Sequence, residues 1–274
     1  MNLSMTSDLA AAYKSGSQRA RVVTEFWGEH NLYCPNCSSP KLTRQTHNTK
    51  VIDFCCPVCK FEYQLKGQKT RFGNSINDGA YESMMAAIRR DDTPNFYFLH
   101  YDLATWSVKN LLLIPHFAFP PSAIIKRPPL KETARRAGWI GCNIALSRIP
   151  PDARISIVKT VPSPSAPPRL CGEDSCSFVS FVSPPEEVRE KFRKIKPLKD
   201  LSTNQRGWTL DVLNIVRRIG KPAFTNEDIY AFQRELEKLH PDNRHIRDKI
   251  RQQLQVLRDT GFLQHISHGE WRLK

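Results

Sequence analysis

The sequence predicts a protein of the α/β or α+β class, with a four-cysteine cluster embedded in an N-terminal core and a small winged helix at the C-terminus. Strand-like and helical segments alternate up to about residue 197, which is typical of a sheet covered by helices. Two Cys-x-x-Cys pairs interrupt that region, and three amphipathic helices followed by a hairpin complete the chain. We therefore expect two domains, at residues 1–197 and 198–274.

The N-terminal elements follow from the spacing of apolar residues. This spacing predicts helices at 17–27 and 79–90, and aromatic or β-branched runs predict strands at 51–54, 61–66, 95–101 and 108–114. The proline-rich stretch at 162–168 predicts a surface loop. Cys171 and Cys176 lack a second ligand pair nearby, so we expect them to be unliganded. A charged helical bridge at 184–199 is expected to lead to the second domain.

The C-terminal domain is predicted from three helices and a hairpin. Apolar residues at helical spacing predict a helix at 208–219. Thr225 and Asp228 have the spacing of a capping box that opens a second helix. A third helix at 244–259 is expected to end at Gly261. A hairpin around 267–269 completes a winged helix.

The chain carries a strong positive charge. It holds 41 Lys and Arg against 27 Asp and Glu, which gives a formal net charge of +14, and its pI is about 9.6. Charge of this size repels itself in a compact state, and a polyanionic partner relieves the repulsion. We therefore expect a nucleic-acid partner. The alternatives are a merely basic soluble protein and one that visits an anionic membrane surface.

Composition also limits the location of the protein. The sequence has no apolar stretch of the roughly 18 residues that could span a bilayer. Residues 1–18 lack the apolar segment of a secretion signal, so we expect a cytoplasmic protein. Eight cysteines in such a chain are expected to be thiols or metal ligands rather than disulfides. We expect no membrane partner and no obligate protein partner.

Four cysteines have the spacing of a zinc site: Cys34, Cys37, Cys56 and Cys59. Zn²⁺ binds four thiolates tetrahedrally and keeps no open position, so the expected site is structural rather than catalytic. Free thiols are the alternative. Cys55 is a rival to Cys56, but only Cys56 lies three positions before Cys59.

Asp53 and the predicted strand at 61–66 carry the residue types of a divalent-cation site. If the two segments are neighbouring strands, Asp53 and Gln64 offer oxygen ligands to one Mg²⁺. The Leu65 carbonyl is a further ligand, and Lys66 is placed to orient or deprotonate an attacking water. Phosphodiester hydrolysis needs such a cation and such a base. The alternative is a solvated strand face with ordinary charges.

Several segments carry a resemblance to a known family: YCPNC at 33–37, DF at 53–54, INDGAY at 76–81, TARRAGWIGCNI at 133–144, RGWT at 206–209 and IRQQLQVLRD at 250–259. The chain resembles, over nearly its whole length, the methyl-directed restriction endonucleases of the Dpn type in the PD-(D/E)xK nuclease superfamily. The resemblance implies an N-terminal catalytic domain, a C-terminal winged helix and Mg²⁺-dependent type II cleavage of double-stranded DNA at GATC sites with methylated adenine.

The resemblance also assigns roles to residues. It implies that Asp53 and Gln64 bind the metal, that Lys66 is the catalytic lysine, and that the four cysteines bind zinc. The stretch at about 160–185 looks like an insertion relative to the family. Ile52 stands where the nominal motif has proline.

Gln64 stands where the motif has an acidic residue, so the site loses a negative charge and should hold the metal more weakly. Related nucleases use a D…QxK variant, so we expect activity. Glu62, on the same strand face, is an alternative ligand. The alternative function is that of a catalytically decayed methyladenine reader or transcriptional regulator.

The predicted helix at 244–259 has an apolar side and a side suited to reading DNA. The second side carries Arg244, Arg247, Arg251, Gln255 and Arg258. In the major groove, Arg pairs with guanine and Gln with adenine edges. A solvated charged face is the alternative.

In the N-terminal domain, Arg135, Arg136 and Trp139 belong to the basic run at 126–139, which we expect to face DNA. Because the methyl group on adenine is apolar, its recognition needs an apolar wall. Trp139 and Trp208 are our candidates, the alternative for each being a core tryptophan.

Overall fold

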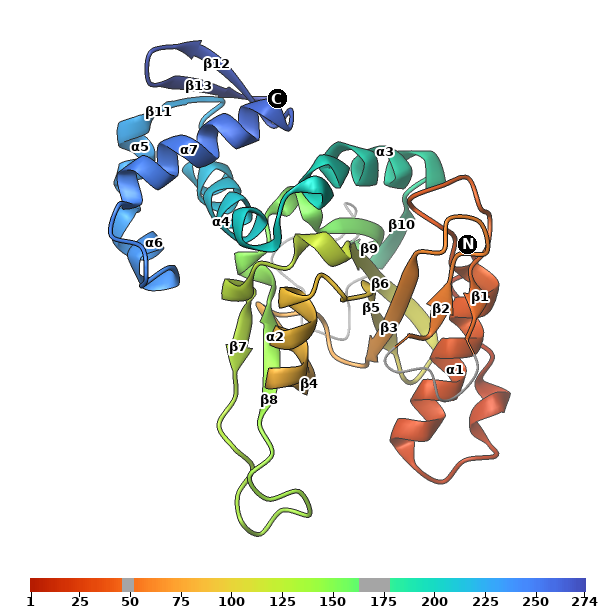
Figure 1. Ribbon diagram of the computed structural model, residues 1–274. Helices are drawn as coiled ribbons and strands as arrows, with labels where there is room; N and C mark the ends of the chain where they lie inside the picture. Colours follow the sequence, from red (N-terminus) through yellow and green to blue (C-terminus); the bar gives the residue numbers. More distant parts are fainter. Residues whose placement is uncertain (46–51, 163–177) are drawn as a thin grey trace, which may run out of the picture. The chain divides into compact units, whose positions relative to one another are not determined.

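The computed structural model describes residues 1–45, 52–162 and 178–274 (Figure 1). Val51, Cys171 and Cys176 therefore lie outside the described residues, as does most of the expected loop at 162–168. Contacts divide the chain into two compact units. The first consists of Met1–Phe72, Pro94–Pro115 and Arg154–Arg193, and the second of Gly73–Thr93, His116–Ala153 and Lys194–Lys274. The boundary between residues 197 and 198 stays a prediction.

The first unit is built on a seven-stranded sheet with the order β1-β2-β3-β5-β6-β9-β10. Its strands are β1 (Thr43–Arg44), β2 (Phe54–Cys55), β3 (Glu62–Gln68), β5 (Asn95–Asp102), β6 (Ser107–Ile114), β9 (Ile155–Pro162) and β10 (Phe178–Val182). β3 and β5 are parallel, and the other neighbours are antiparallel. The central strands β5 and β6 are rich in apolar and aromatic residues, and Phe96, Phe98 and Leu111 are fully buried. The predicted strands at 61–66, 95–101 and 108–114 are therefore confirmed.

Helix α1 (Gly16–Asn31) packs against β3 and confirms the helix expected at 17–27. The approach is close at Gly28, where a Cβ atom would lie 2.8 Å from Phe54 Cζ and 3.1 Å from Leu65 Cδ2. Only glycine leaves room for both side chains at this point. Phe54 and Leu65 thus mark the face of the sheet that α1 covers. Since successive side chains alternate, Gln64 and Lys66 lie on the other face of β3.

The second unit contains a three-stranded sheet that the sequence analysis did not predict. Its order is β4-β8-β7, with β4 (Ser75–Ala80), β7 (Ile124–Lys126) and β8 (Gly141–Ala145), and α2 (Tyr81–Arg89) packs on it. The predicted helix at 79–90 was too long at its start, because Ala80 pairs with Gly141 as part of β4. Residues 127–140 link β7 to β8 as a long extension, which we call the arm (Figure 1).

The C-terminal part of the second unit holds four helices and a small sheet. These are α4 (Thr203–Ile219), α5 (Asn226–Tyr230), α6 (Gln233–Leu239) and α7 (Ile246–Asp259), with β11 (Ala223–Thr225), β12 (Leu263–Ser267) and β13 (Glu270–Leu273) in the order β11-β13-β12. The capping box of Thr225 and Asp228 is formed, and Gly261 follows α7 with φ of 89°. The terminal hairpin is also confirmed, whereas α6 and β11 were not predicted.

Helix α4 also packs on the rest of the second unit through polar contacts. The Arg206 side chain, only 6% exposed, forms an ion pair with Asp91 after α2. Arg217 Nε donates to Asp152 Oδ2 at 2.8 Å, and Asn214 Nδ2 donates to Ser147 O at 2.9 Å. The C-terminal helices therefore belong to the same compact unit as residues 73–93 and 116–153.

Some predicted boundaries were wrong. The predicted strand at 51–54 is reduced to β2, and Asp53 directly precedes it. The insertion expected at about 160–185 stays a prediction, and within it β10 pairs with β9 in register from Phe178 with Pro162 to Val182 with Val158. The charged bridge is helical, as α3 (Pro185–Ile195). Within the described ranges, no helix combines the length and apolar character needed to cross a membrane.

Candidate active site

Asp53 lies beside the strand that carries Gln64 and Lys66. Its N–H donates to Tyr63 O at 3.0 Å, and its carboxylate Oδ2 accepts a hydrogen bond from the Leu65 N–H at 2.8 Å. The carboxylate therefore lies against the middle of β3. The structure brings together the segments that the sequence analysis expected to form a cation site.

The Gln64 amide oxygen is a buried acceptor in need of a partner. Oε1 is shielded from solvent and accepts no hydrogen bond from any described residue. An unsatisfied buried polar atom costs about 1–3 kcal/mol, so such atoms call for a ligand or an ordered water. Amide and carboxylate oxygens are ligands that Mg²⁺ accepts, so Asp53 and Gln64 fit this cation.

Lys66 completes the set on β3. Its side chain is half-buried, and Nζ lies 5.4 Å from the ring centroid of Phe96 on the neighbouring strand β5. The aromatic ring supports the ammonium group by a cation–π contact and limits its range of positions. The contact with Phe96 thus holds Lys66 Nζ beside β3.

The charges around Asp53 act on its carboxyl group in opposite directions. Burial raises the pKa of Asp53 above its usual value, and the negative charge of Glu25 raises it further. The Leu65 N–H and the positive charges of Arg21 and Lys66 work against this rise. Because burial disfavours the ionised form, a cation bound at Asp53 would stabilise that form.

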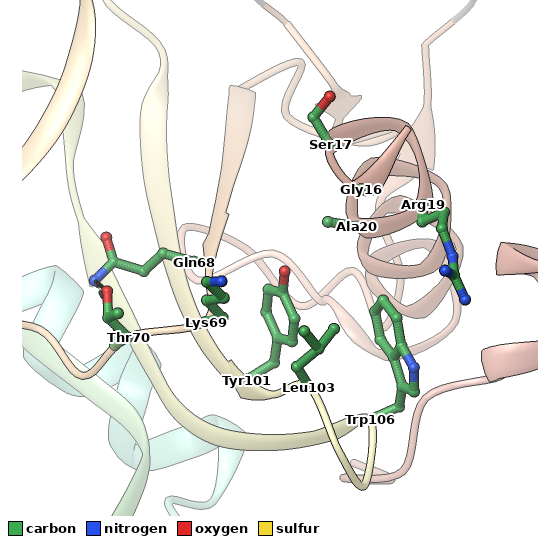
Figure 2. A pocket seen from close by; sticks show the side chains of 10 residues that line it. All are labelled: Gly16, Ser17, Arg19, Ala20, Gln68, Lys69, Thr70, Tyr101, Leu103 and Trp106. Atoms are coloured by element: carbon green, nitrogen blue, oxygen red, sulfur yellow. Dashed lines mark hydrogen bonds between the residues drawn. The ribbon is translucent and has the colours of Figure 1, made fainter. Parts of the chain in front are cut away.

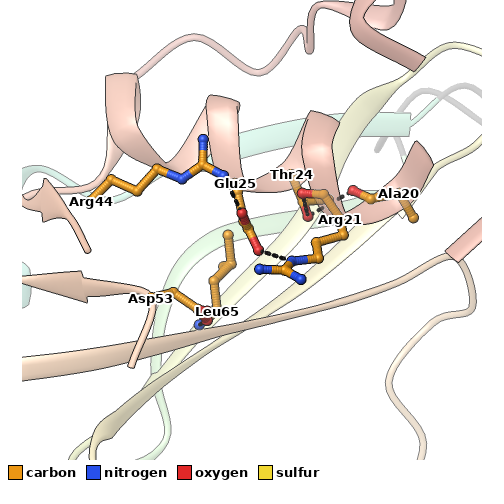
Figure 3. A network of polar contacts seen from close by, with 7 residues as sticks. All are labelled: Ala20, Arg21, Thr24, Glu25, Arg44, Asp53 and Leu65. Carbon is orange, nitrogen blue, oxygen red and sulfur yellow. Dashed lines mark hydrogen bonds and ion pairs between the residues drawn. The ribbon is translucent and has the colours of Figure 1, made fainter. Parts of the chain in front are cut away.

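An ion-pair network on α1 adjoins this site (Figure 3). Arg21 Nε donates to Glu25 Oε1 at 2.5 Å, and Arg44 in β1 pairs with Glu25 Oε2. The Glu25 side chain is 9% exposed and points from α1 toward the segments that carry Asp53 and Leu65. Glu25 was not among the site residues predicted from the sequence. Its signal was an acidic residue between Val23 and Trp27, on the buried part of a predicted helix.

The four predicted metal-binding cysteines converge in the first unit. The sulfur atoms of Cys34, Cys37, Cys56 and Cys59 all lie within 4.8 Å of one another. Two of these distances, Cys34 to Cys59 and Cys37 to Cys56, are 3.5 Å. A tetrahedral ion with bonds of about 2.3 Å sets sulfurs about 3.8 Å apart, so the cluster fits Zn²⁺. Cys55 stays outside the cluster, as its Sγ contacts Cys56 O at 3.6 Å.

The surroundings of the cysteine cluster hold it in place and favour the thiolate at Cys56, whereas burial raises the pKa of Cys34 and Cys37. Arg189 on α3 donates from Nε to the carbonyl oxygens of Cys34 and Cys37, at 3.2 and 2.9 Å. Burial raises the pKa of Cys56, but hydrogen bonds from the N–H groups of Cys59 and Val58 outweigh burial and lower this pKa to about 6. A thiol with such a pKa is ready to bind a metal at neutral pH.

A cavity of about 610 Å³ lies between the start of α1 and the end of β3 (Figure 2). Its wall includes Tyr101 and Trp106, whose rings are stacked 5.5 Å apart. Arg19 and Lys69 contribute positive charge to its lining. It therefore adds basic and aromatic surface just beyond the strand segment that carries Lys66.

Helix α7 has the two faces that the sequence predicted. Ile246, Ile250, Leu254 and Leu257 are buried. The five residues predicted to read DNA are all exposed: Arg244, Arg247, Arg251, Gln255 and Arg258. Arg244 lies in the turn before α7 rather than within the helix, because α7 begins at Ile246.

The arm carries the other predicted DNA-facing residues. Backbone hydrogen bonds hold its two sides together, from Arg127 N to Gly141 O and from Leu130 N to Trp139 O, both at 2.9 Å. Arg135 and Arg136 are exposed near its tip. Trp139 is half-buried beneath Arg136, whose Cζ lies 4.7 Å from the ring centroid. The arm thus presents basic side chains with one aromatic ring.

Trp208 does not form an exposed wall. Its side chain is 5% exposed and stacks on His240 at 3.5 Å between ring centroids. The Trp208 ring is enclosed because it lies on the core side of α4, among the buried residues of that helix. We therefore assign Trp208 to packing, the alternative that its helical context had left open.

The mixed α/β fold, the Asp53 carboxylate against the strand that carries Gln64 and Lys66, and an exposed basic helix face of the kind that a helix-turn-helix (HTH) presents together suit an enzyme that acts on DNA. The chain belongs to the Dam-replacing family, because the DpnI family model matches residues 1–165. A second model, the Dam-replacing HTH domain, matches residues 204–273. The resemblance found in the sequence is thus confirmed, and the family is one of methyl-directed restriction endonucleases with a DNA-binding HTH domain.

Proposed function

We propose that the chain is a type II restriction endonuclease that hydrolyses DNA at GATC sites with methylated adenine, using Mg²⁺ and a PD-(D/E)xK nuclease core. The observation that carries this proposal is the position of the Asp53 carboxylate against β3, which bears the buried Gln64 oxygen and Lys66. Family membership supports the reaction class.

The residues divide the work of hydrolysis between them. Asp53, Gln64 and the Leu65 carbonyl would hold Mg²⁺, which supplies neutralisation of the charge that develops on the phosphate. Lys66 Nζ would hold the attacking water or remove its proton. The Phe96 ring and the hydrogen bond between Leu65 N–H and Asp53 keep both functional groups in place before substrate arrives.

Digestion of plasmid DNA tests the proposal. We expect plasmid from an adenine-methylating host to be cut in the presence of Mg²⁺, and plasmid from a non-methylating host to stay intact. EDTA should prevent cutting, because it removes the cation that Asp53 holds. Sequencing of the ends gives the site. Failure to cut either plasmid with Mg²⁺ would contradict the proposal.

A methyladenine reader without nuclease activity is the second candidate. The neutral side chain of Gln64 favours it, because the site then has one carboxylate fewer to hold a cation. A reader would shift methylated duplex in a gel without breaking a strand. If the wild-type protein does not cut DNA and the Gln64→Glu variant does, the result would favour this second candidate.

We also propose that the cysteine cluster holds a structural Zn²⁺. Four thiolates leave no open position, so this ion would take no part in hydrolysis. Its support comes from the geometry of the sulfurs and from Arg189, which ties both sides of the first cysteine pair to α3.

Gln255 on α7 gives a test of DNA reading by the C-terminal helices. If its amide pairs with an adenine edge, Gln255→Ala should reduce the preference for GATC over other sequences by roughly tenfold to a hundredfold. Gln252→Ala is the matched control, because Gln252 is also exposed but accepts a hydrogen bond from Lys249 Nζ at 2.8 Å. Fluorescence anisotropy measures the affinity of each variant for a GATC duplex and for an unrelated duplex, and the ratio of the two affinities gives the preference. Equal losses of preference in the two variants would contradict the assignment.

A further inference from the structure

Tyr63 on β3 is a fully buried residue whose side chain the proposed reaction does not use. Its hydroxyl oxygen lies 3.2 Å from Cys34 Sγ, within hydrogen-bond distance. The two residues are 29 positions apart in the chain, so the fold brings them together. A buried hydroxyl needs a hydrogen-bond partner, and the partner of this one is a sulfur of the cysteine cluster.

The sulfur is the acceptor in this contact when the cluster holds a metal. A cysteine binds a metal as the thiolate, which carries no proton, so only the Tyr63 O–H can donate. A hydrogen bond to an ionised acceptor is about twice as strong as one between neutral groups. The Tyr63 hydroxyl would therefore stabilise Cys34 in its metal-binding form.

Cys34 needs a donor because of where it lies in the cluster. Four thiolates outweigh the charge of one divalent ion, so a loaded cluster carries excess negative charge. Cys37 and Cys59 are partly exposed, so solvent can offset part of this charge. The buried Cys56 Sγ accepts from the Cys59 N–H at 3.4 Å. Cys34 is fully buried, and Tyr63 supplies its side-chain donor beside N–H groups of its own turn.

The main chain of Tyr63 contacts the candidate active site. The Tyr63 carbonyl oxygen accepts the Asp53 N–H at 3.0 Å, and Tyr63 pairs with Phe54 where β2 adjoins β3. Gln64 follows Tyr63 directly in the chain. A shift of Tyr63 would therefore move the segments that carry the Asp53 carboxylate and the Gln64 amide.

We propose that Tyr63 is a positioning residue that fixes β3 against the cysteine cluster. This inference rests on the proposed structural zinc and the proposed cation site, and deepens both. The Tyr63 hydroxyl donates to the Cys34 thiolate and makes the metal harder to remove. Through the Tyr63 main chain, the cluster also sets the position of Asp53. The cluster would thus support the hydrolytic site without taking part in the reaction.

Tyr63→Phe keeps the ring and removes the hydroxyl, so it tests the inference in the intact, metal-loaded protein. The zinc Kd, measured by competition with a chelator, should rise about tenfold to a hundredfold. In the Co²⁺-substituted protein, the sulfur-to-cobalt charge-transfer band should move to longer wavelength, because the hydrogen bond lowers the energy of the sulfur electrons. Hydrogen exchange of the Asp53 amide should become roughly twofold to tenfold faster, as expected for the loss of one hydrogen bond.

Tyr97→Phe is the matched control. Tyr97 is also buried, on the neighbouring strand β5, and its ring lies 5.5 Å from that of Tyr63 between centroids. Its hydroxyl donates to a carbonyl oxygen, that of Tyr33, at 2.8 Å. Both variants lose one buried hydroxyl, but only Tyr63→Phe loses a donor to sulfur. Tyr97→Phe should therefore keep the cobalt band at its wild-type wavelength.

The outcomes separate the inference from the proposals on which it rests. If the wild-type protein binds zinc, and Tyr63→Phe matches Tyr97→Phe in zinc Kd and cobalt band, the inference is wrong and the zinc site stands. If the wild-type protein binds neither zinc nor cobalt, the zinc proposal itself fails. An Asp53 amide that exchanges at the wild-type rate in Tyr63→Phe would overturn the link to the candidate active site. None of these measurements needs DNA cleavage, so they are independent of the test of hydrolysis.

A second replacement covers the case in which Tyr63→Phe does not fold. Incorporation of 3-fluorotyrosine at position 63 keeps the hydroxyl and makes it a stronger donor, because fluorine withdraws electrons from the ring. The cobalt band should then move to shorter wavelength, and an unchanged band would overturn the inference.

Discussion

Replacement of Lys66 by alanine should reduce the rate constant of DNA cleavage by about 10²- to 10⁴-fold, the usual contribution of a group that positions or transfers the reacting proton. The loss follows because no other described lysine shares the middle of β3 with Asp53. Binding of methylated duplex should change little, since Lys66 is one positive charge among the many that the chain can offer to phosphates. Single-turnover cleavage with excess enzyme measures the rate constant, and fluorescence anisotropy measures binding.

Lys69→Ala is the control for Lys66→Ala. Lys69 lies just beyond β3 at the edge of the cavity, so its removal takes away the same charge from the same part of the unit. We expect Lys69→Ala to weaken DNA binding slightly and to leave the single-turnover rate constant near that of the wild type. Cleavage by Lys66→Ala at the wild-type rate would remove Lys66 from the reaction.

Replacement of Cys56 by serine should empty the proposed zinc site and unfold the region around it. A structural zinc site provides roughly 10–16 kcal/mol in zinc-finger peptides, whereas a whole domain is stable by only about 5–15 kcal/mol. The cluster joins the segment that carries Cys34 and Cys37 to the turn that carries Cys59, so loss of the metal would remove the link between them. Metal analysis by mass spectrometry should show loss of zinc, and circular dichroism should show a lower Tm.

Cys55→Ser is the control at the adjacent position. Its sulfur lies outside the four-cysteine cluster, so zinc content and Tm should stay close to those of the wild type. The comparison is sharp because the two variants differ by one place in the chain and make the same chemical change. Equal zinc content in Cys56→Ser and Cys55→Ser would contradict the assignment of Cys56 as a zinc ligand.

The parts of the fold that the sequence predicted are those with a strong local pattern. β5 is a largely aromatic run, β6 ends in the apolar run from Leu111 to Ile114, and α7 has an apolar residue at nearly every core position. The sheet β4-β8-β7 escaped prediction because its signal is not local. Ser75–Ala80 contains Asn, Asp and Gly, which rarely form strands alone, and its partner β8 is about 60 residues away in the chain.

Helix starts were predicted less well, because polar side chains near a helix start can accept hydrogen bonds from backbone N–H groups and form a local turn instead. The His245 N–H donates to Asn243 Oδ1 at 2.8 Å, and this local turn keeps Arg244 out of α7. Helix α6 was missed because it is short and polar, with Leu236 its only described buried residue.

The sequence predicted the part of the candidate site whose residues lie close together in the chain. Asp53, Gln64 and Lys66 lie in two adjacent segments, so a pairing of those segments was enough to bring them together. Glu25 could not be placed from the sequence, because its distance from Asp53 depends on how α1 packs on β3. Gly28 permits that packing, but its role could not be predicted, because it depends on where the fold places Phe54 and Leu65.

The ion pairs of α4 have a consequence for how the C-terminal region melts. Because Arg206 and Arg217 on α4 pair with Asp91 and Asp152, α4 cannot separate from those segments without losing both ion pairs. The HTH helices and the β4-β8-β7 sheet should therefore lose their amide protection against hydrogen exchange together, as one cooperative foldon. A cut between residues 197 and 198 would divide this foldon rather than release an independent module.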